Sequence, residues 1–290
     1  LNGGDEAGGV VTSEGAESDC RGVKTARDKA RAEKGIRHGK MIIPRTAHPS
    51  FVKAAEWLDV EFEHMPFGDD LRTHADALEG MIDDRTFLCV GGAPAYPYGM
   101  VDPIPEMAAI AAAKGVPFHV DSCLGGFMLP WVERLGFSVP EWDFRVPGVT
   151  SISADIHKYG YAIKGASVLL HRPKSNLKHQ VFFFNDWPGG IYGTQGFLGT
   201  KPAAPIGAAW AVMHYLGGEG YMRLAGETMS ATKRLRDGVA AIDGVHVWGE
   251  PDMSVVALGS HDHEILAIGD KLNERGWHFD RQERPDTIRL

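Results

Sequence analysis

The sequence has 290 residues, 43% hydrophobic and 23% charged, which is enough apolar material for one large domain and a smaller one. Its 30 Lys and Arg residues face 38 Asp and Glu residues, and the net charge of −8 argues against nucleic acid as the main partner. The composition excludes a disordered chain. No window reaches the roughly 18 consecutive apolar residues of a membrane-spanning helix.

The cysteines Cys20, Cys89 and Cys123 lie far apart, without a C-x-x-C pair. This spacing predicts neither a disulfide framework nor a zinc site, and it favours a reducing compartment, the cytoplasm. The sequence begins without Met and runs at once into a loop-to-helix motif, so we expect a fragment of a longer protein. A membrane anchor upstream of the sequence stays open.

Short β-rich runs alternate with helical segments through the first two thirds of the chain. This alternation predicts an α/β fold, in which a mainly parallel sheet is covered by helices and functional residues gather at the carboxyl ends of strands. Asp121 and Lys158 follow two such runs directly, and His48 follows another. The predicted strands are 40–44, 86–92, 117–122, 149–154 and 166–172, and a helix is predicted over 105–115.

The pattern changes near Glu219, where a long amphipathic helix over 220–242 begins. Two strands, a helix and the start of a last strand are predicted after it, at 245–249, 253–260, 263–277 and 284–290. We therefore expect a large domain over 1–217 and a small α+β domain over 218–290. The His-Asp-His-Glu run at 261–264 lies at a turn before a helix, and we interpret it as structural, not as a metal site.

Small and hydroxyl residues at 12–16, among them Ser13, Gly15 and Ala16, lead into a strongly helical run. A helix N-terminus offers unpaired backbone N–H groups and partial positive charge, so this loop can hold a phosphate. The alternative is that Ser13 caps the helix. Glu14 and Glu17 place negative charge where an anion would bind.

The stretch "FHVDSCLGGF" at 118–127 delivers Asp121 to the end of an apolar strand. A buried carboxylate needs a cation, and a protonated pyridine nitrogen is a suitable one, although Asp121 could equally cap the next helix. We expect His119 to point to the opposite face of the strand from Asp121.

The stretch "TSISADIHKYGYAIKG" at 150–165 places His157 and Lys158 at the end of a strand. A lysine with a lowered pKa is a Schiff-base nucleophile, and the adjacent histidine can donate to a phosphate. Taken alone, such a pair is more often a pair of solvated side chains. The order of anion loop, His48, strand-end Asp121 and strand-end Lys158 favours the chemical interpretation.

The stretches "HVDSCLGGFMLPWVERLG", "SISADIHKYGYAIKG" and "NDWPGGIYGTQGFLGTKPA" resemble the sphingosine-1-phosphate lyase family, within the group II pyridoxal-dependent decarboxylases of fold type I. The resemblance covers the whole chain and implies that an N-terminal segment and a short C-terminal piece of the family are missing here. It implies pyridoxal 5'-phosphate as cofactor, with Lys158 as Schiff-base lysine and Asp121 paired with the pyridinium. By the same resemblance, His48 stacks on the ring, while Ser13, Gly15, Ala16 and His157 bind the cofactor phosphate.

For the substrate, the resemblance implies that Lys164 binds a phosphate and that Tyr96 relays a proton at the reacting hydroxyl. From the residues alone, Lys164 is equally a solvated turn charge, and Tyr96 equally packs a proline-rich turn. The implied reaction is that of an aldehyde-lyase: retro-aldol cleavage of a phosphorylated sphingoid base to a long-chain aldehyde and phosphoethanolamine. A homodimer is also implied.

Three departures from the family pattern keep two alternatives open. Glu14 stands where the family has glycine, Ala16 where it has threonine, and Lys201 where it has arginine, which would bind a phosphate with two parallel hydrogen bonds. One alternative is an amino-acid decarboxylase with the same cofactor. The other is a non-catalytic fragment or pseudoenzyme that keeps the fold.

Overall fold

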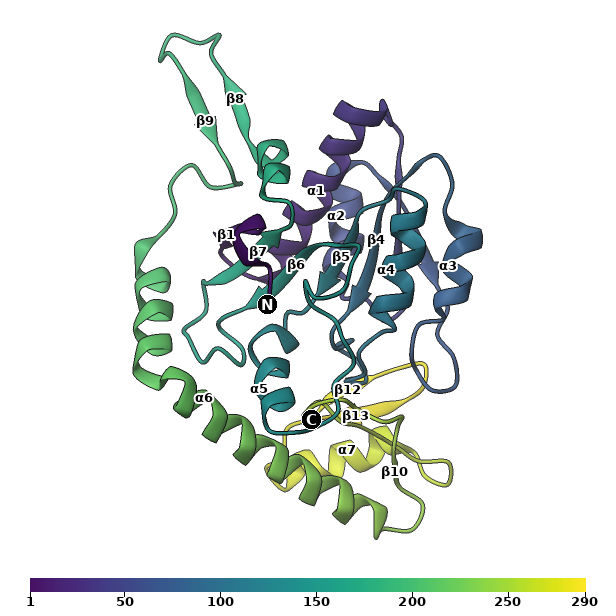
Figure 1. The fold of residues 1–290 in the computed structure, drawn as a ribbon. Helices are drawn as coiled ribbons and strands as arrows, with labels where there is room; N and C mark the ends of the chain where they lie inside the picture. Colours follow the sequence, from purple (N-terminus) through teal and green to yellow (C-terminus); the bar gives the residue numbers. More distant parts are fainter.

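Seven strands form the central sheet of the computed structural model, which describes residues 1–290 (Figure 1). Their order is β1-β7-β6-β5-β4-β2-β3, and the five strands from β6 to β3 are parallel. The predicted α/β fold with a mainly parallel sheet is confirmed. The strands are β1 (Gly8–Thr12), β2 (Lys40–Pro44), β3 (Glu61–Met65), β4 (Thr86–Gly92), β5 (Phe118–Asp121), β6 (Val149–Asp155) and β7 (Ser167–His171).

Strand β7 runs antiparallel to both of its neighbours, β1 and β6. Because the direction reverses twice, β1 and β6 point the same way. Thr12 at the end of β1 and Asp155 at the end of β6 both pair with Ser167. The loop after β1 and the turn after β6 therefore start at the same edge of the sheet.

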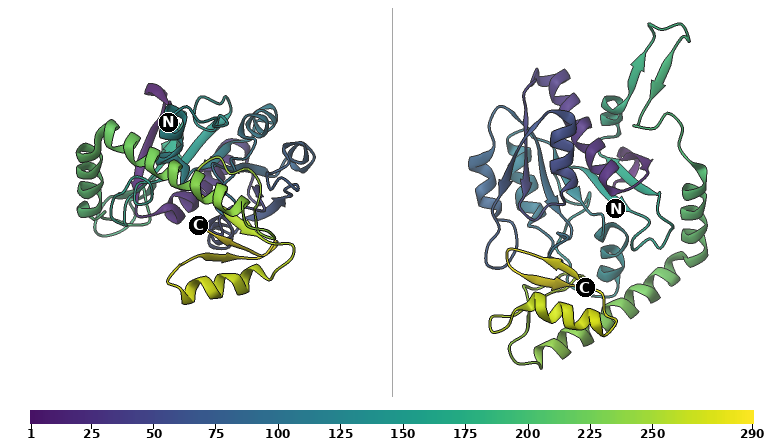
Figure 2. Two further views of the ribbon diagram at one scale, coloured as in Figure 1. Left: turned by 90° about the horizontal axis from the view of Figure 1, so that it is seen from below. Right: turned by 180° about the vertical axis from the view of Figure 1, so that it is seen from behind.

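Helices cover both faces of the sheet (Figures 1 and 2). Side chains alternate between the two faces of a strand. Ile42 therefore packs in the core between the sheet and α4, and Ile43 packs in the core between the sheet and helices α1 and α2. Trp142 is fully buried in the first of these cores. The helices are α1 (Gly15–Lys34), α2 (Ser50–Leu58), α3 (Ala75–Met81), α4 (Ile104–Ala113) and α5 (Leu129–Arg134).

A long helix, α6 (Ala203–Ala240), leads from the large sheet to a second, antiparallel one. The sequence predicted this helix only from about 220, because Gly217 interrupts it with a left-handed φ of 55°. Beyond it, α7 (Ile265–Glu274) packs on a four-stranded sheet (Figure 2), which confirms a small α+β part. Its strand order is β10 (His246–Val247), β11 (Ala257–Gly259), β13 (Thr287–Arg289) and β12 (Asp280–Gln282).

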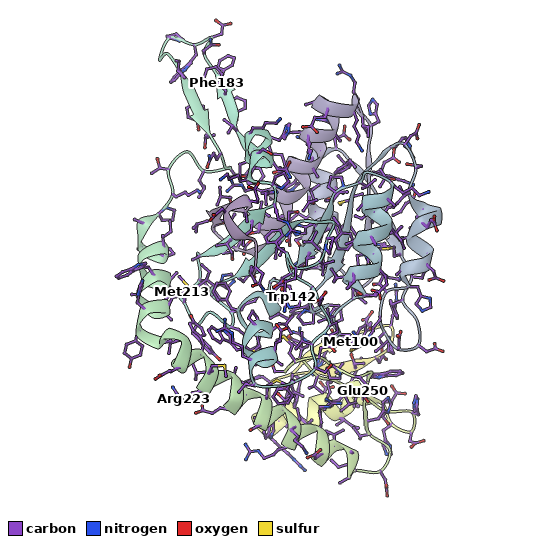
Figure 3. The ribbon with its side chains drawn as sticks, in the orientation of Figure 1. Met100, Trp142, Phe183, Met213, Arg223 and Glu250 are labelled. Carbon is purple, nitrogen blue, oxygen red and sulfur yellow. The ribbon has the colours of Figure 1, made fainter.

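A hairpin of β8 (Phe182–Phe184) and β9 (Tyr192–Thr194) projects from the body of the molecule (Figure 1). Figure 3 contrasts its Phe183, which is 58% exposed, with the fully buried Trp142 in the interior. No helix has both the length and the apolar character that crossing a membrane requires.

Candidate active site

Lys158 lies in the turn that follows β6, and its Nζ is 3.0 Å from Asp155 Oδ2. Asp155 ends the strand, and its side chain is 2% exposed. Burial alone would lower the pKa of the Lys158 amine, but the neighbouring Cys123 and Asp155 outweigh burial and raise it. The amine is therefore held as a cation until its partner is displaced or neutralised.

Asp121, at the end of β5, is a second buried carboxyl at the same edge. Burial raises its pKa to about 6, although the Cys123 backbone N–H donates to its Oδ1 at 3.1 Å and the Ser153 hydroxyl donates at 3.3 Å. A buried carboxyl that ionises with difficulty gains from any cation placed beside it. This is the electrostatic condition expected for pairing with a protonated ring nitrogen.

His119 lies on the same face of β5 as Asp121, contrary to the sequence-based expectation. Its Nε2 is 3.2 Å from Ser153 Oγ, and Ser153 also contacts Asp121. The expectation was wrong because residues two apart in a strand share a face. Burial lowers the pKa of His119 to about 4, so this ring is neutral.

The loop after β1 leads into the first turn of α1. The backbone N–H and the hydroxyl of Ser13 both donate to Glu17 Oε2, each at 2.7 Å. Ser13 is not the N-cap, because Glu14 has that position and makes no side-chain cap bond. Glu14 is exposed, so its charge points away from the interior. The Glu17 carboxylate thus takes the Ser13 donors at the place where an anion was predicted.

Gly15 brings this loop against the turn that carries Lys158. A Cβ at Gly15 would lie 2.6 Å from Asp155 Oδ2, so no other residue fits without displacing that carboxyl. Ala16, the next residue, is half-buried in the first turn of α1. Three sequence-predicted positions, Gly15, Ala16 and Lys158, are therefore brought to one edge of the sheet.

His157 and Lys164 differ in how firmly they are held. His157 Nδ1 is 3.1 Å from the Ala166 carbonyl oxygen, which fixes the ring beside β7. Lys164 is exposed and makes no hydrogen bond or ion pair.

Lys201 lies near Arg21 and Glu17. Burial lowers the pKa of the Lys201 amine, and the positive charge of Arg21 lowers it further. The loop that carries Lys201 is tied to α1, since Arg21 Nη2 donates to the Gln195 carbonyl at 2.5 Å.

His48 and Tyr96 meet edge to face, with ring centroids 5.9 Å apart. His48 Nδ1 is 2.9 Å from Ser50 Oγ, at the start of α2. The Tyr96 hydroxyl donates to Asp280 Oδ2 at 3.2 Å, and the Arg289 guanidinium lies 3.5 Å from the centroid of its ring. Tyr96 therefore contacts both His48 and the small C-terminal sheet.

Sequence reasoning missed three residues of this region: Asp19, Asp155 and Arg289. Asp155 carries the same signal as Asp121, a carboxylate at the end of an apolar strand, and that signal could have identified it. Asp19 lies on the buried face of α1, where its burial gives no local sequence pattern. Arg289 reaches Tyr96 only through the tertiary fold.

Two buried carboxylate oxygens, Asp155 Oδ1 and Asp19 Oδ1, have no hydrogen-bond partner. Burying a carboxylate oxygen costs free energy unless a hydrogen-bond donor or a cation lies beside it. Together with Asp121 and the amine of Lys158, they fit a cofactor that carries a ring cation and reacts with an amine. The space that Gly15 leaves beside Asp155 fits the close approach of such a group.

A strand-end lysine among buried carboxyls, on a mainly parallel sheet with a small antiparallel sheet beside it, is the arrangement of fold-type-I pyridoxal enzymes. Residues 2–259 match the family described as the pyridoxal-dependent decarboxylase conserved domain, and the chain belongs to that family.

Among curated proteins, the chain is 41% identical over 282 residues to sphingosine-1-phosphate lyase of Arabidopsis thaliana, covering 97% of this chain and 52% of that protein. It is 38% identical over 289 residues to sphingosine-1-phosphate lyase 1 of Rattus norvegicus, covering 99% of this chain and 51% of that protein. The chain thus spans about half the length of these relatives.

Among solved structures, the sphingosine-1-phosphate lyase of Burkholderia pseudomallei superposes with a TM-score of 0.96 at 41% identity, covering all of this chain and 66% of that one. A glutamate decarboxylase of Lactobacillus brevis has a TM-score of 0.83 at 21% identity, covering 98% and 69%, and shows the fold alone. The family resemblance drawn from the sequence is confirmed.

Proposed function

We propose that this chain is the core of a pyridoxal-phosphate-dependent carbon–carbon lyase that cleaves phosphorylated sphingoid bases to a long-chain aldehyde and phosphoethanolamine. The observation that carries the proposal is the Lys158 amine at 3.0 Å from Asp155, at the same sheet edge as the buried Asp121. The similarity at 41% identity to proteins named sphingosine-1-phosphate lyase supports the substrate class.

The cofactor, when bound, supplies an electron sink for the electron pair of the carbon–carbon bond that breaks. In the proposed site Lys158 would hold the cofactor through its amine, and Asp121 would pair with the ring nitrogen. His48 would contact the ring. Ser13, Gly15, Ala16 and His157 would bind the cofactor phosphate, which requires Glu17 to release the Ser13 donors.

Two further residues are proposed to act on the substrate. Lys164 is exposed and has no partner, so its ammonium group is free to bind the phosphate of the sphingoid base. The hydroxyl of Tyr96, beside His48, relays the proton of the reacting substrate hydroxyl. It accepts that proton as it passes its own to the carboxylate of Asp280, to which it donates in the free chain.

The test is incubation of the chain, loaded with pyridoxal phosphate, with sphingosine 1-phosphate, followed by mass spectrometry of the products. We expect long-chain aldehyde and phosphoethanolamine in equal amounts from the wild-type chain and neither from Lys158→Ala. Carbon dioxide from an amino acid, without aldehyde from the phosphorylated base, would instead indicate a decarboxylase. A folded chain that fails to bind the cofactor would indicate the non-catalytic alternative.

We also propose that the chain forms a homodimer through the β8–β9 hairpin and the start of α6. These segments expose large apolar side chains that a monomer would normally bury, and a second copy offers the same apolar surface in return. They are Phe182, Phe183, Phe184, Trp187, Ile191, Tyr192, Trp210 and Tyr215.

Two further proposals concern organisation and location. We propose a division into 1–217 and 218–290, supported by the break of α6 at Gly217 and by the separate small core that contains Val239 and Ile288. Limited proteolysis near Gly217 tests it.

We propose the cytoplasm as the location, supported by three cysteines that are all unpaired and buried.

A further inference from the structure

One hydroxyl group connects Asp19 on α1 with His48 ahead of α2. Ser50 Oγ is 2.6 Å from Asp19 Oδ2 and 2.9 Å from His48 Nδ1. Ser50 is buried, so bulk water does not compete for either contact. A serine hydroxyl has a single proton to donate, and it therefore goes to either the carboxyl or the imidazole.

The surroundings of Asp19 favour its neutral form. Its side chain is 3% exposed, and its Oδ1 has no hydrogen-bond partner. The nearest ring nitrogen, His119 Nε2, is 3.9 Å away and is already within 3.2 Å of Ser153 Oγ. Burial raises the pKa of Asp19 to about 7, even though the contact with Ser50 lowers it.

The position of His48 shows which way the proton of Ser50 points in that state. The backbone N–H of Ser50 also donates to His48 Nδ1, at 3.2 Å, so Nδ1 accepts and bears no proton. When Asp19 is a neutral acid, its O–H donates to Ser50 Oγ, and Ser50 in turn donates to Nδ1. The imidazole proton then resides on Nε2.

We propose that Asp19 is a positioning residue that decides, through Ser50, which ring nitrogen of His48 carries the proton. As a neutral acid, Asp19 keeps the proton of His48 on Nε2. As a carboxylate, it draws the Ser50 proton to itself. The imidazole proton then shifts toward Nδ1, which gives up its contact with the Ser50 backbone N–H and donates to Ser50 Oγ instead. The value of this for catalysis rests on the proposed function of His48, but the relay belongs to the free chain.

Other titratable groups also face Asp19, and the experiment has to separate them from it. Asp121 and His119 approach from β5, and Asp155 and Lys158 from the turn after β6. None of these four residues is hydrogen-bonded to Ser50. On α1 itself, Cys20 is also close to Ser50. Its thiol contacts the Ser50 carbonyl oxygen, at 3.9 Å, and not the Ser50 hydroxyl.

The experiment is nitrogen-15 NMR of histidine-labelled, cofactor-free chain at about pH 6 and about pH 8.5, with His48 assigned by His48→Gln. Protonated and unprotonated ring nitrogens have widely separated shifts, so the fraction of neutral His48 with its proton on Nδ1 is measured directly. In the wild type we expect this fraction to rise severalfold at the higher pH. In Asp19→Asn and in Ser50→Ala the rise should vanish.

Asp121→Asn is the matched control, because it removes the other buried carboxyl but leaves the Asp19–Ser50–His48 contacts. The rise should persist in this variant. A wild-type fraction that does not change with pH, or a rise that survives in Asp19→Asn, would overturn the proposal. A rise that survives in Ser50→Ala would also overturn it, since the coupling would then act through space. Because no turnover is measured, a failed lyase assay leaves this test intact.

Discussion

The amine of Lys158 and the carboxylate of Asp155 form an ion pair of 3.0 Å at the carboxyl edge of the sheet. Asp155 is nearly inaccessible to water, whereas 29% of the Lys158 side chain is exposed. The pair therefore holds the amine near the protein surface while its counter-ion stays inside. Before the amine can attack a carbonyl carbon it has to lose a proton, and Asp155 opposes that loss.

Asp155→Asn should accelerate the reaction of Lys158 with pyridoxal phosphate near neutral pH. Removing the carboxylate lowers the pKa of Lys158, and each unit raises the neutral amine fraction by about tenfold. The rate is measured by borohydride trapping and mapping of the modified lysine, from about pH 6 to about pH 9. At each pH in this range the variant should react faster than the wild type. Identical pH profiles would contradict the assigned role of Asp155.

Gly15→Ala should destabilise the chain by about 1–3 kcal/mol, because the added methyl group would overlap the Asp155 carboxyl. Gly207→Ala, in α6, is the matched control: a Cβ there meets nothing within 4 Å, so this change should stabilise by about 0.5–1 kcal/mol. Both free energies of unfolding come from urea titration. Equal effects of the two substitutions would show that the loop does not press on Asp155.

Asp19→Asn should stabilise the cofactor-free chain increasingly as the pH rises. The pKa of Asp19 is raised to about 7, so between about pH 4 and pH 7 the folded state binds more protons than the unfolded state at this position. Stability conferred by a raised carboxyl pKa is lost as the pH rises, and the isosteric amide avoids that loss. The advantage of the variant should grow by about 2–3 kcal/mol between pH 5 and pH 8.

The control for this prediction is Asp237→Asn, since Asp237 is exposed and paired with Lys233 on the surface of α6. Its effect on the free energy of unfolding should not grow over the same pH range. The buried histidines His119 and His171, whose pKa values are lowered, oppose the Asp19 effect below about pH 6.5. Both histidines are present in both chains, so the prediction compares the two chains at each pH and not one chain at different pH values.

Phe183→Asp should convert the proposed dimer into a monomer, because a charge in the middle of an apolar contact loses its water without gaining a partner. The mass is measured by analytical ultracentrifugation. Phe137→Asp, an exposed apolar residue outside the hairpin, serves as a control and should leave the mass unchanged. A wild-type chain that is monomeric at all concentrations would refute the interface.

The sequence was informative where hydrophobic runs are long and bounded by turn residues. The predicted strands 40–44 and 86–92 coincide with β2 and β4, and 149–154 falls one residue short of β6. Strand β3 was missed because it is a sheet-edge strand with mostly exposed side chains, and β1 because two of its five residues are glycine.

The candidate site was predictable in its order along the chain and not in its contacts. The loop at 12–16, His48, Asp121 and Lys158 each lie at or after the end of a strand, and the end of a strand can be recognised from the local sequence. The partners of these residues depend on the tertiary fold: Asp19 meets Ser50 across two helices, and Arg289 covers Tyr96 from the end of the chain. The predicted exposure of Lys164 as a turn charge agrees with the structure, while its role stays a prediction.

The reversed strand β7 makes the assembly of this edge a late event in folding. The loop after β1 is aligned with the turn after β6 only once β7 has paired with both, and Ser18 contacts the Val168 carbonyl from 150 residues away in the chain. Contacts between such distant segments form slowly, because the intervening chain must first be ordered. All five parallel strands precede β7 in the chain, so they leave the ribosome before the strand that aligns the loop after β1 with the turn after β6.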